Sequence, residues 1–375
     1  MRLVLPLLLL FALPQDDVIV AGKENWEKPW LPDFKKPDGR VDLPAEARID
    51  VVLFPDGYLA AERKDFEKDV QDWYEKFQKL TPWKQLRGAF RVRGLWLPSE
   101  ARSTADKKSR FAVPVGANGV GDVNTKETRQ AVFDALGKID HNKAGKQHMT
   151  HTVVVILVKD EKGRNPSGLT RRLASPDDKR TVGVAFAAYS HHEFGHAFAG
   201  LIDEYILKAD DKSKAKPPAK MNLWTTGNIA ATKELKSLPW AHLAPGSAIN
   251  PDKESVVGVC WIGGVAEEGA WHCEARCLMN GWHDNWDLAK TKRGTGLRDM
   301  ERFCFWCEEL CVARTLAKTG RLGDSEDGEE LWKKWEELRP AYQKLFDVAG
   351  RIKAQNEANA KTKLAEAKIY ERPSP

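Results

Sequence analysis

The feature that most constrains the fold is a continuous apolar run at residues 152–158, Thr-Val-Val-Val-Ile-Leu-Val. A strand with apolar side chains on both sides has to be buried on both faces. This occurs in sheets whose two faces are both covered by helices. The run therefore predicts a central strand in a layered fold that contains both helices and strands.

Other strand patterns lie at residues 49–54, 90–97 and 182–187, and we expect the last of these to form an edge strand. Residues 159–180 read as a polar loop, and residues 126–138 as a helix. A helix between the first two strands is predicted by an apolar stripe at helical spacing, made of Phe66, Val70, Trp73, Phe77 and Leu80. Strands and helices alternate, so the predicted fold class is α+β, with mixed α/β layers around a central mixed sheet.

The N-terminus has the pattern of a secretory signal peptide. Arg2 precedes a short leucine-rich apolar run at residues 3–13, which is too short for a stable membrane anchor. We therefore expect residues 1–21 to be a signal peptide and the chain to be exported, to the periplasm or the extracellular space. No later segment is long and apolar enough to cross a membrane. The net charge of +5 comes from interleaved basic and acidic residues, which gives no case for nucleic-acid binding.

Six cysteines lie close together in the second half of the chain: Cys260, Cys273, Cys277, Cys304, Cys307 and Cys311. In an oxidising compartment an even set of this kind favours disulfides, whose pairing cannot be read from sequence. The alternative is a structural zinc site made by Cys273-x3-Cys277 and Cys304-x2-Cys307.

The strongest chemical motif is the run His192-Glu193-Phe194-Gly195-His196. Two histidines four residues apart project from one face of a helix, where both can bind one Zn²⁺ at about 2.0–2.1 Å. Glu193 lies beside the position of a metal-bound water and can take its proton as general base. A catalytic zinc site uses three protein ligands and keeps one position open, so a third ligand is needed.

Asp203 is the predicted third ligand, with Glu204 as the second choice. On an unbroken helix Asp203 would lie about 10 Å along the axis from His196, too far to share an ion. Gly200 resolves this because glycine can adopt positive φ, end the helix and turn the chain back.

Three neighbours of the motif have weaker assignments. His191 lies on a different helix face, which favours a supporting or surface position over metal ligation. Ser190 and Glu193 match a capping box, but a Glu193 that faces the metal cannot also cap, so the helix begins earlier or Ser190 caps alone. Tyr205 can donate a hydrogen bond to an oxyanion or to a ligand carboxylate, or it can pack as support.

The stretch HEFGHAFAGLIDEY resembles the signature of the IgA-peptidase family of zinc metallopeptidases. It is also similar to the metzincin pattern HExxHxxGxxH, with one extra residue before the glycine and an acid in place of the third histidine. Further similar stretches include residues 49–58, 277–280 and 303–307, so that the resemblance spans roughly residues 47–311. It implies a zincin- or metzincin-like catalytic domain with an active-site helix, and it places Met279 in a methionine turn beneath the zinc.

The domain organisation that follows is a signal peptide at residues 1–21, an extended lead-in at 22–46, a catalytic domain at 47–320 and a charged helical tail at 321–375. The predicted function is that of an exported zinc metalloendopeptidase with one catalytic Zn²⁺ and a protein or peptide substrate. Two alternatives remain: a non-catalytic binding module on a peptidase-like fold, and a zinc amidase acting on cell-wall peptide. The cleaved bond and the oligomeric state are not fixed by the sequence.

Overall fold

The computed structural model describes residues 17–25, 47–105, 109–116, 119–141, 151–177, 180–187, 191–205, 208–212, 220–243, 260–262, 266–274, 276–280, 302–361 and 370–371. Residues 1–16 of the predicted signal peptide, residues 26–46 of the predicted lead-in and Ser190 lie outside the described residues.

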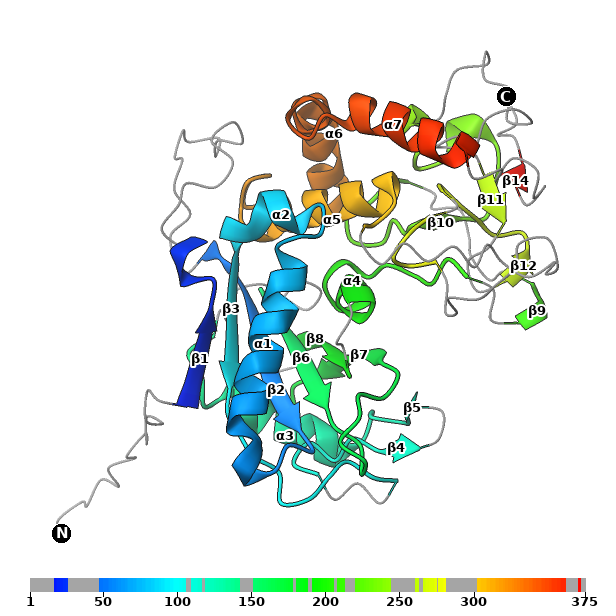
Figure 1. Ribbon diagram of the computed structural model, residues 1–375. Helices are drawn as coiled ribbons and strands as arrows, with labels where there is room; N and C mark the ends of the chain where they lie inside the picture. The colour runs from blue at the N-terminus through cyan, green and yellow to red at the C-terminus, as the bar shows by residue number, and fades with distance from the viewer. Residues whose placement is uncertain are drawn as a thin grey trace, which may run out of the picture.

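A six-stranded mixed sheet forms the centre of the protein (Figure 1). Its strand order is β1 (Val18–Ala21), β3 (Phe90–Leu95), β2 (Ile49–Asp56), β6 (Thr152–Val158), β8 (Thr181–Phe186) and β7 (Leu169–Ala174). The inner strands run parallel to one another, and the two edge strands β1 and β7 run antiparallel to their neighbours. The predicted mixed sheet is confirmed.

Strand β6 is buried along its whole length, as its apolar run predicts. Val153 and Val155 belong to the core on one face of the sheet, and Val154 and Ile156 to the core on the other. This alternation is the ordinary period of two of a strand. Core side chains therefore cover both faces of β6.

Helices α1 (Arg63–Phe77) and α3 (Lys126–Leu136) cover opposite faces of the sheet (Figure 1). In α1 the predicted stripe is buried at Phe66, Val70, Trp73 and Phe77, which confirms that helix and its orientation. Leu80 is also buried, just after the helix ends.

The prediction for residues 159–180 was wrong. Residues 169–174 form β7, which pairs with β8, so β8 is an inner strand and not the edge. The reason is that an edge strand with one solvent-facing side needs few apolar residues, and β7 contains the exposed pair Arg171 and Arg172.

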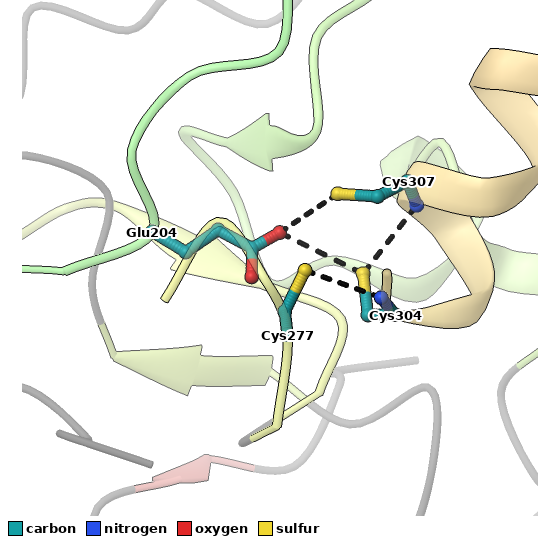
Figure 2. A group of neighbouring side chains, drawn as sticks. All are labelled: Glu204, Cys277, Cys304 and Cys307. Carbon is teal, nitrogen blue, oxygen red and sulfur yellow. Dashed lines mark hydrogen bonds between the residues drawn. The ribbon is translucent and has the colours of Figure 1, made fainter. Parts of the chain in front are cut away.

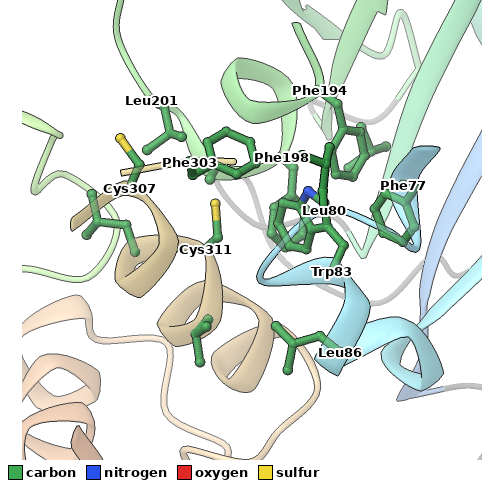
Figure 3. Close-up of a cluster of buried hydrophobic side chains, with 14 of the residues drawn as sticks. Phe77, Leu80, Trp83, Leu86, Phe194, Phe198, Leu201, Phe303, Cys307 and Cys311 are labelled. Atoms are coloured by element: carbon green, nitrogen blue, oxygen red, sulfur yellow. The ribbon is translucent and has the colours of Figure 1, made fainter. Parts of the chain in front are cut away.

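Three C-terminal helices stack at one end of the sheet: α5 (Phe305–Lys318), α6 (Gly328–Leu345) and α7 (Val348–Lys361) (Figure 1). Every residue of α5 is buried, and α5 packs beside the motif helix α4 (His191–Ala199) and the short helix α2 (Trp83–Leu86) (Figure 3). The charged tail docks on α5 through α6, whose Trp335 and Tyr342 are buried.

Small sheets complete the fold. A four-stranded sheet has the order β10 (Ile229–Ala230), β13 (Trp271–His272), β11 (Cys260–Ile262) and β14 (Tyr370–Glu371). Two pairs are formed by β12 (Ala266–Glu268) with β9 (Lys208–Lys212), and by β4 (Val115–Gly116) with β5 (Gly119–Val120). Among the described residues, no helix has the length and apolar character needed to cross a membrane.

Candidate metal centre

Two glycines allow the motif helix α4 to pack close to the sheet and to Met279. A side chain at Gly195 would lie 3.0 Å from the Met279 sulfur, and one at Gly183 on β8 would meet the carbonyl oxygen of Ala197 at 2.3 Å. On the core side of α4, Phe194 and Phe198 stack and join the aromatic cluster around Trp83 (Figure 3). The histidine side of the helix is therefore fixed in orientation.

His192, His196 and Asp203 converge on one point. The two Nε2 atoms are 3.1 Å apart, and Oδ1 of Asp203 lies 3.0 Å from Nε2 of His192 and 3.1 Å from Nε2 of His196. The three form one of two groups of potential metal ligands among the described residues. Three atoms bound at about 2.0–2.1 Å to one tetrahedral ion would stand about 3.3 Å apart, so the observed triangle fits such an ion.

Each histidine is oriented by a backbone carbonyl. Nδ1 of His192 lies 2.8 Å from the carbonyl oxygen of Leu278, and Nδ1 of His196 lies 2.5 Å from that of Leu201. A carbonyl oxygen only accepts, so both protons sit on Nδ1 and both Nε2 lone pairs face each other and the Asp203 carboxylate. Such lone pairs repel unless a cation or a proton lies among them, which makes this donor set suited to a metal ion.

The electrostatics of the triangle agree with this. Burial would raise the pKa of Asp203, but hydrogen bonds and charges of the two histidines hold it far below its usual range. Burial would lower the pKa of His196, but the Asp203 carboxylate outweighs it and raises that pKa. A metal ion among the three ligand atoms would supply the positive charge that the Asp203 carboxylate attracts.

Gly200 directs Asp203 to the triangle. Helix α4 ends at Ala199, and Gly200 follows with φ of 57°, its N–H donating to the His196 carbonyl oxygen at 2.9 Å. The next segment is clamped by Asn228, whose side chain accepts from the Ile202 N–H at 2.6 Å and donates to the Ile202 carbonyl oxygen at 2.8 Å.

Glu193 is placed by the edge strand β7. The Thr170 hydroxyl lies 2.7 Å from Oε2 of Glu193 and 2.9 Å from its backbone oxygen, and its single proton can serve one of them at a time. Gly168 leaves the space for this carboxylate, since a side chain there would come within 2.6 Å of Cγ of Glu193. The Glu193 side chain thus contacts β7.

The neighbours of the motif lie in different surroundings. His191 is buried against Trp73, with ring centroids 4.5 Å apart, and burial lowers its pKa to about 3. It faces the core as a neutral ring, away from the triangle. Tyr205 stacks on His192 at 6.3 Å between centroids, next to the triangle.

Glu204 is not at the histidines. It is fully buried beside Cys277, Cys304 and Cys307, which form the second group of potential metal ligands (Figure 2). Asp203 and Glu204 are consecutive and point to different clusters, so only one of them is available to His192 and His196. Burial, reinforced by charge on Cys277, raises the pKa of Glu204 well above its usual value.

The predicted disulfides are absent from the described cysteines: Cys273, Cys277, Cys304, Cys307 and Cys311 form no disulfide bond. The side chain of Cys260 lies outside the description. The alternative prediction is a zinc site that includes Cys273. The group of potential metal ligands found among the described residues contains Glu204 beside Cys277, Cys304 and Cys307, and does not contain Cys273. Folding brings Glu204 to the cysteines from a segment far away in sequence.

Sequence reasoning missed the groups that support the triangle. The carbonyl groups of Leu201 and Leu278 carry no side-chain signal, and Thr170 lies on β7, for which the sequence predicts a loop. The roles of Gly168 and Thr170 could be predicted only if β7 were recognised as a strand beside the motif helix.

A family model described as IgA Peptidase M64 matches residues 41–252, more than half of the chain. The match includes the triangle, Glu193 and Thr170, and it ends before the first of the six cysteines. No curated protein matches the chain.

Proposed function

The chain belongs to the IgA Peptidase M64 family, which implies hydrolysis of peptide bonds by a metallopeptidase, and from this premise we propose that it is a zinc metalloendopeptidase. The observation that carries the proposal is the triangle of His192, His196 and Asp203, with both histidine Nδ1 atoms committed to carbonyl oxygens. Two imidazoles and one carboxylate are a ligand set of catalytic zinc, which keeps a fourth position open.

A bound zinc ion would supply a Lewis acid and a water of lowered pKa. The chain's own residues then have distinct tasks. His192, His196 and Asp203 hold the ion, and Glu193 accepts a proton from the attacking water as general base. Thr170 is a positioning residue, because its hydroxyl bonds to the Glu193 carboxylate. Tyr205 stands close enough to His192 to support its ring or to donate a hydrogen bond to the substrate.

The arrangement supports a metzincin-like catalytic domain. The motif helix ends at a glycine of positive φ, the third ligand follows that turn, and Met279 lies beneath the helix against Gly195. In this proposal Met279 forms the floor of the site, and its backbone is tied to the ligand segment because the Glu204 N–H donates to the Met279 carbonyl oxygen at 2.8 Å.

The test is Glu193→Gln, which keeps size and hydrogen bonding but removes the base. Cleavage of an unfolded protein substrate should fall by about 10²–10⁴-fold, the usual contribution of a general base. Zinc content should stay the same, because Glu193 is not a ligand in this proposal. Glu75→Gln, an exposed change on α1, is the matched control and should leave both measurements unchanged.

Full cleavage by Glu193→Gln would refute the mechanism. Absence of any cleavage by a zinc-loaded wild-type chain across a peptide library would favour a binding module. Release of cell-wall peptide without cleavage of the library would favour an amidase.

We also propose that the chain is exported, on the pattern of Arg2 and the apolar run after it. The measurement is mass spectrometry of the N-terminus of the protein from its native cell. An intact Met1 on protein from the cytoplasm would contradict export.

A further inference from the structure

We propose that Glu204, Cys277, Cys304 and Cys307 form a second metal site, which holds a structural Zn²⁺ and thereby fixes the ligands of the first (Figure 2). Three of these residues lie beyond the region matched by the family model. The proposal concerns different ligands from those of the catalytic ion and goes beyond the proposed function.

The geometry of the four side chains suits a tetrahedral ion. Their ligand atoms all lie within 4.8 Å of one another, and Oε1 of Glu204 is 3.1 Å from Sγ of Cys307 and 3.6 Å from Sγ of Cys304. Sulfur atoms bound to zinc at about 2.3 Å stand about 3.8 Å apart. Small side-chain shifts are therefore enough to close the group around one ion.

Backbone N–H groups prepare the sulfur atoms for negative charge. Sγ of Cys277 accepts from the Cys304 N–H at 3.1 Å and from the Met279 N–H at 3.4 Å. Sγ of Cys304, the N-cap of α5, accepts from the Cys307 N–H at 3.4 Å. The positive end of the helix dipole also lies at these two cysteines, and thiolates are stabilised there.

A cation at this position would complete the partners of Glu204. Its side chain is completely buried, and Oε2 accepts no hydrogen bond, while Oε1 accepts from Asn228 at 3.0 Å and from the thiols. Nδ1 of the buried His272 lies 3.5 Å from Oε2. A carboxylate without a full set of partners is costly inside a protein, and a divalent ion on Oε1 or Oε2 would remove that cost.

A disulfide satisfies this site less well than an ion. A bond between any two of the three sulfur atoms would join only two of the four groups, and the third thiol and the Glu204 side chain would stay buried beside it. Zinc uses all four groups, is not reduced or oxidised, and binds as the three thiols release their protons to solvent. Thiolate ligands also select zinc over magnesium and calcium, which prefer oxygen.

The second site is joined to the first through two short backbone links. Glu204 follows Asp203 directly, and Leu278 follows Cys277 directly while its carbonyl oxygen orients His192. An ion that holds Glu204 and Cys277 therefore fixes the positions of a catalytic ligand and of a group that orients another. The second ion would therefore position the ligands of the first, which a structural ion far from them could not do.

The test counts zinc in the purified full-length chain by elemental mass spectrometry. Wild-type protein should hold two zinc ions, and the pair Cys304→Ala with Cys307→Ala should hold one. The matched control is Cys311→Ala, a buried free thiol one turn further along α5 but outside the group, which should keep two. The pair His192→Ala with His196→Ala should also hold one, so failure of the catalytic site is scored separately.

A second measurement does not need the cysteine variants to fold. The His192→Ala and His196→Ala pair, loaded with Co²⁺, should show the near-ultraviolet absorption of cobalt bound to thiolate, because only the cysteine site remains. One zinc in the wild type that disappears with the two histidines would overturn the proposal, as would a cobalt-loaded variant without thiolate absorption.

Discussion

Gly200 is the residue on which the third ligand depends, and Gly200→Ala should both destabilise the protein and weaken its zinc. Its φ of 57° is left-handed, where a residue with a side chain costs about 1–2 kcal/mol. The added Cβ would meet only Arg172 Nη2 at 3.5 Å, an ordinary contact, so the cost is conformational and not steric. If the turn relaxes to relieve this cost, Asp203 moves away from the histidines.

Gly137, at the end of α3, gives a matched comparison. Its φ is −63°, and a Cβ there would lie 3.4 Å and 3.5 Å from its nearest neighbours, so alanine fits without strain. Gly137→Ala should leave the free energy of unfolding unchanged or raise it by up to about 1 kcal/mol, because the unfolded chain loses freedom. Gly200→Asn should cost less than Gly200→Ala, because asparagine tolerates left-handed φ.

The assay combines urea unfolding of the zinc-loaded variants with a chelator competition for zinc. A strain of about 1–2 kcal/mol that is transferred to the site corresponds to a loss of about 5- to 30-fold in zinc affinity, at 1.4 kcal/mol for each factor of ten. Equal stability of Gly200→Ala and Gly137→Ala, with unchanged zinc affinity in both, would refute the role of the turn.

Three further predictions concern Glu193, Glu309 and the bound zinc. Thr170→Val should lower kcat by about 10-fold or more with zinc content unchanged, since a hydrogen bond to a charged group is worth about 1.5–3 kcal/mol, and Thr170→Ser should restore most of it. Glu309→Gln should lower the free energy of unfolding by about 3 kcal/mol, because this buried carboxylate binds Arg339 at 2.7 Å and His242 at 2.6 Å; the exposed control Glu336→Gln should change it by less than about 0.5 kcal/mol. Burial would raise the pKa of Glu309, but His242 and Arg339 hold it below the usual 4.5. The stabilisation by the Glu309 carboxylate is therefore present above pH 4.5 and is lost as the pH falls further. The free energies of unfolding of the wild type and Glu309→Gln, measured as the pH is lowered, should converge. Removing zinc with a chelator should lower the unfolding temperature of the wild type, and added zinc should restore it in proportion to the logarithm of its concentration.

The central layers could be predicted because their signals are local. The apolar run of β6 and the apolar stripe of α1 each predict a buried element from local sequence, and the structure confirms both. The sequence of β7 has no apolar pattern of this kind. The strand is held by its backbone hydrogen bonds to β8, and Arg171 and Arg172 are exposed to solvent. Edge strands of this kind are recognised only once their neighbour is known.

The docking of the C-terminal helices also depends on long-range partners. Glu308 on α5 binds Arg351 of α7 and accepts from the Tyr342 hydroxyl of α6 at 3.1 Å. In sequence these are one acid on α5 and one tyrosine and one arginine in the charged tail, and nothing local marks them as partners. Charge count predicts solvent exposure, and only the fold shows that Glu308 is buried.

The pair Asp203-Glu204 shows which part of the metal site could not be predicted from the sequence, and which physical rule decides it. Sequence left both acids as candidates for the third ligand. Once Gly200 ends the helix, consecutive side chains in a non-helical segment turn to different sides, as they do along a strand, so one acid faces the histidines and the other must face away. In this protein the space away from the histidines is the core, where a carboxylate is costly without partners. The Asp-Glu pair therefore requires a second polar cluster behind the first, and Cys277, Cys304 and Cys307 supply it.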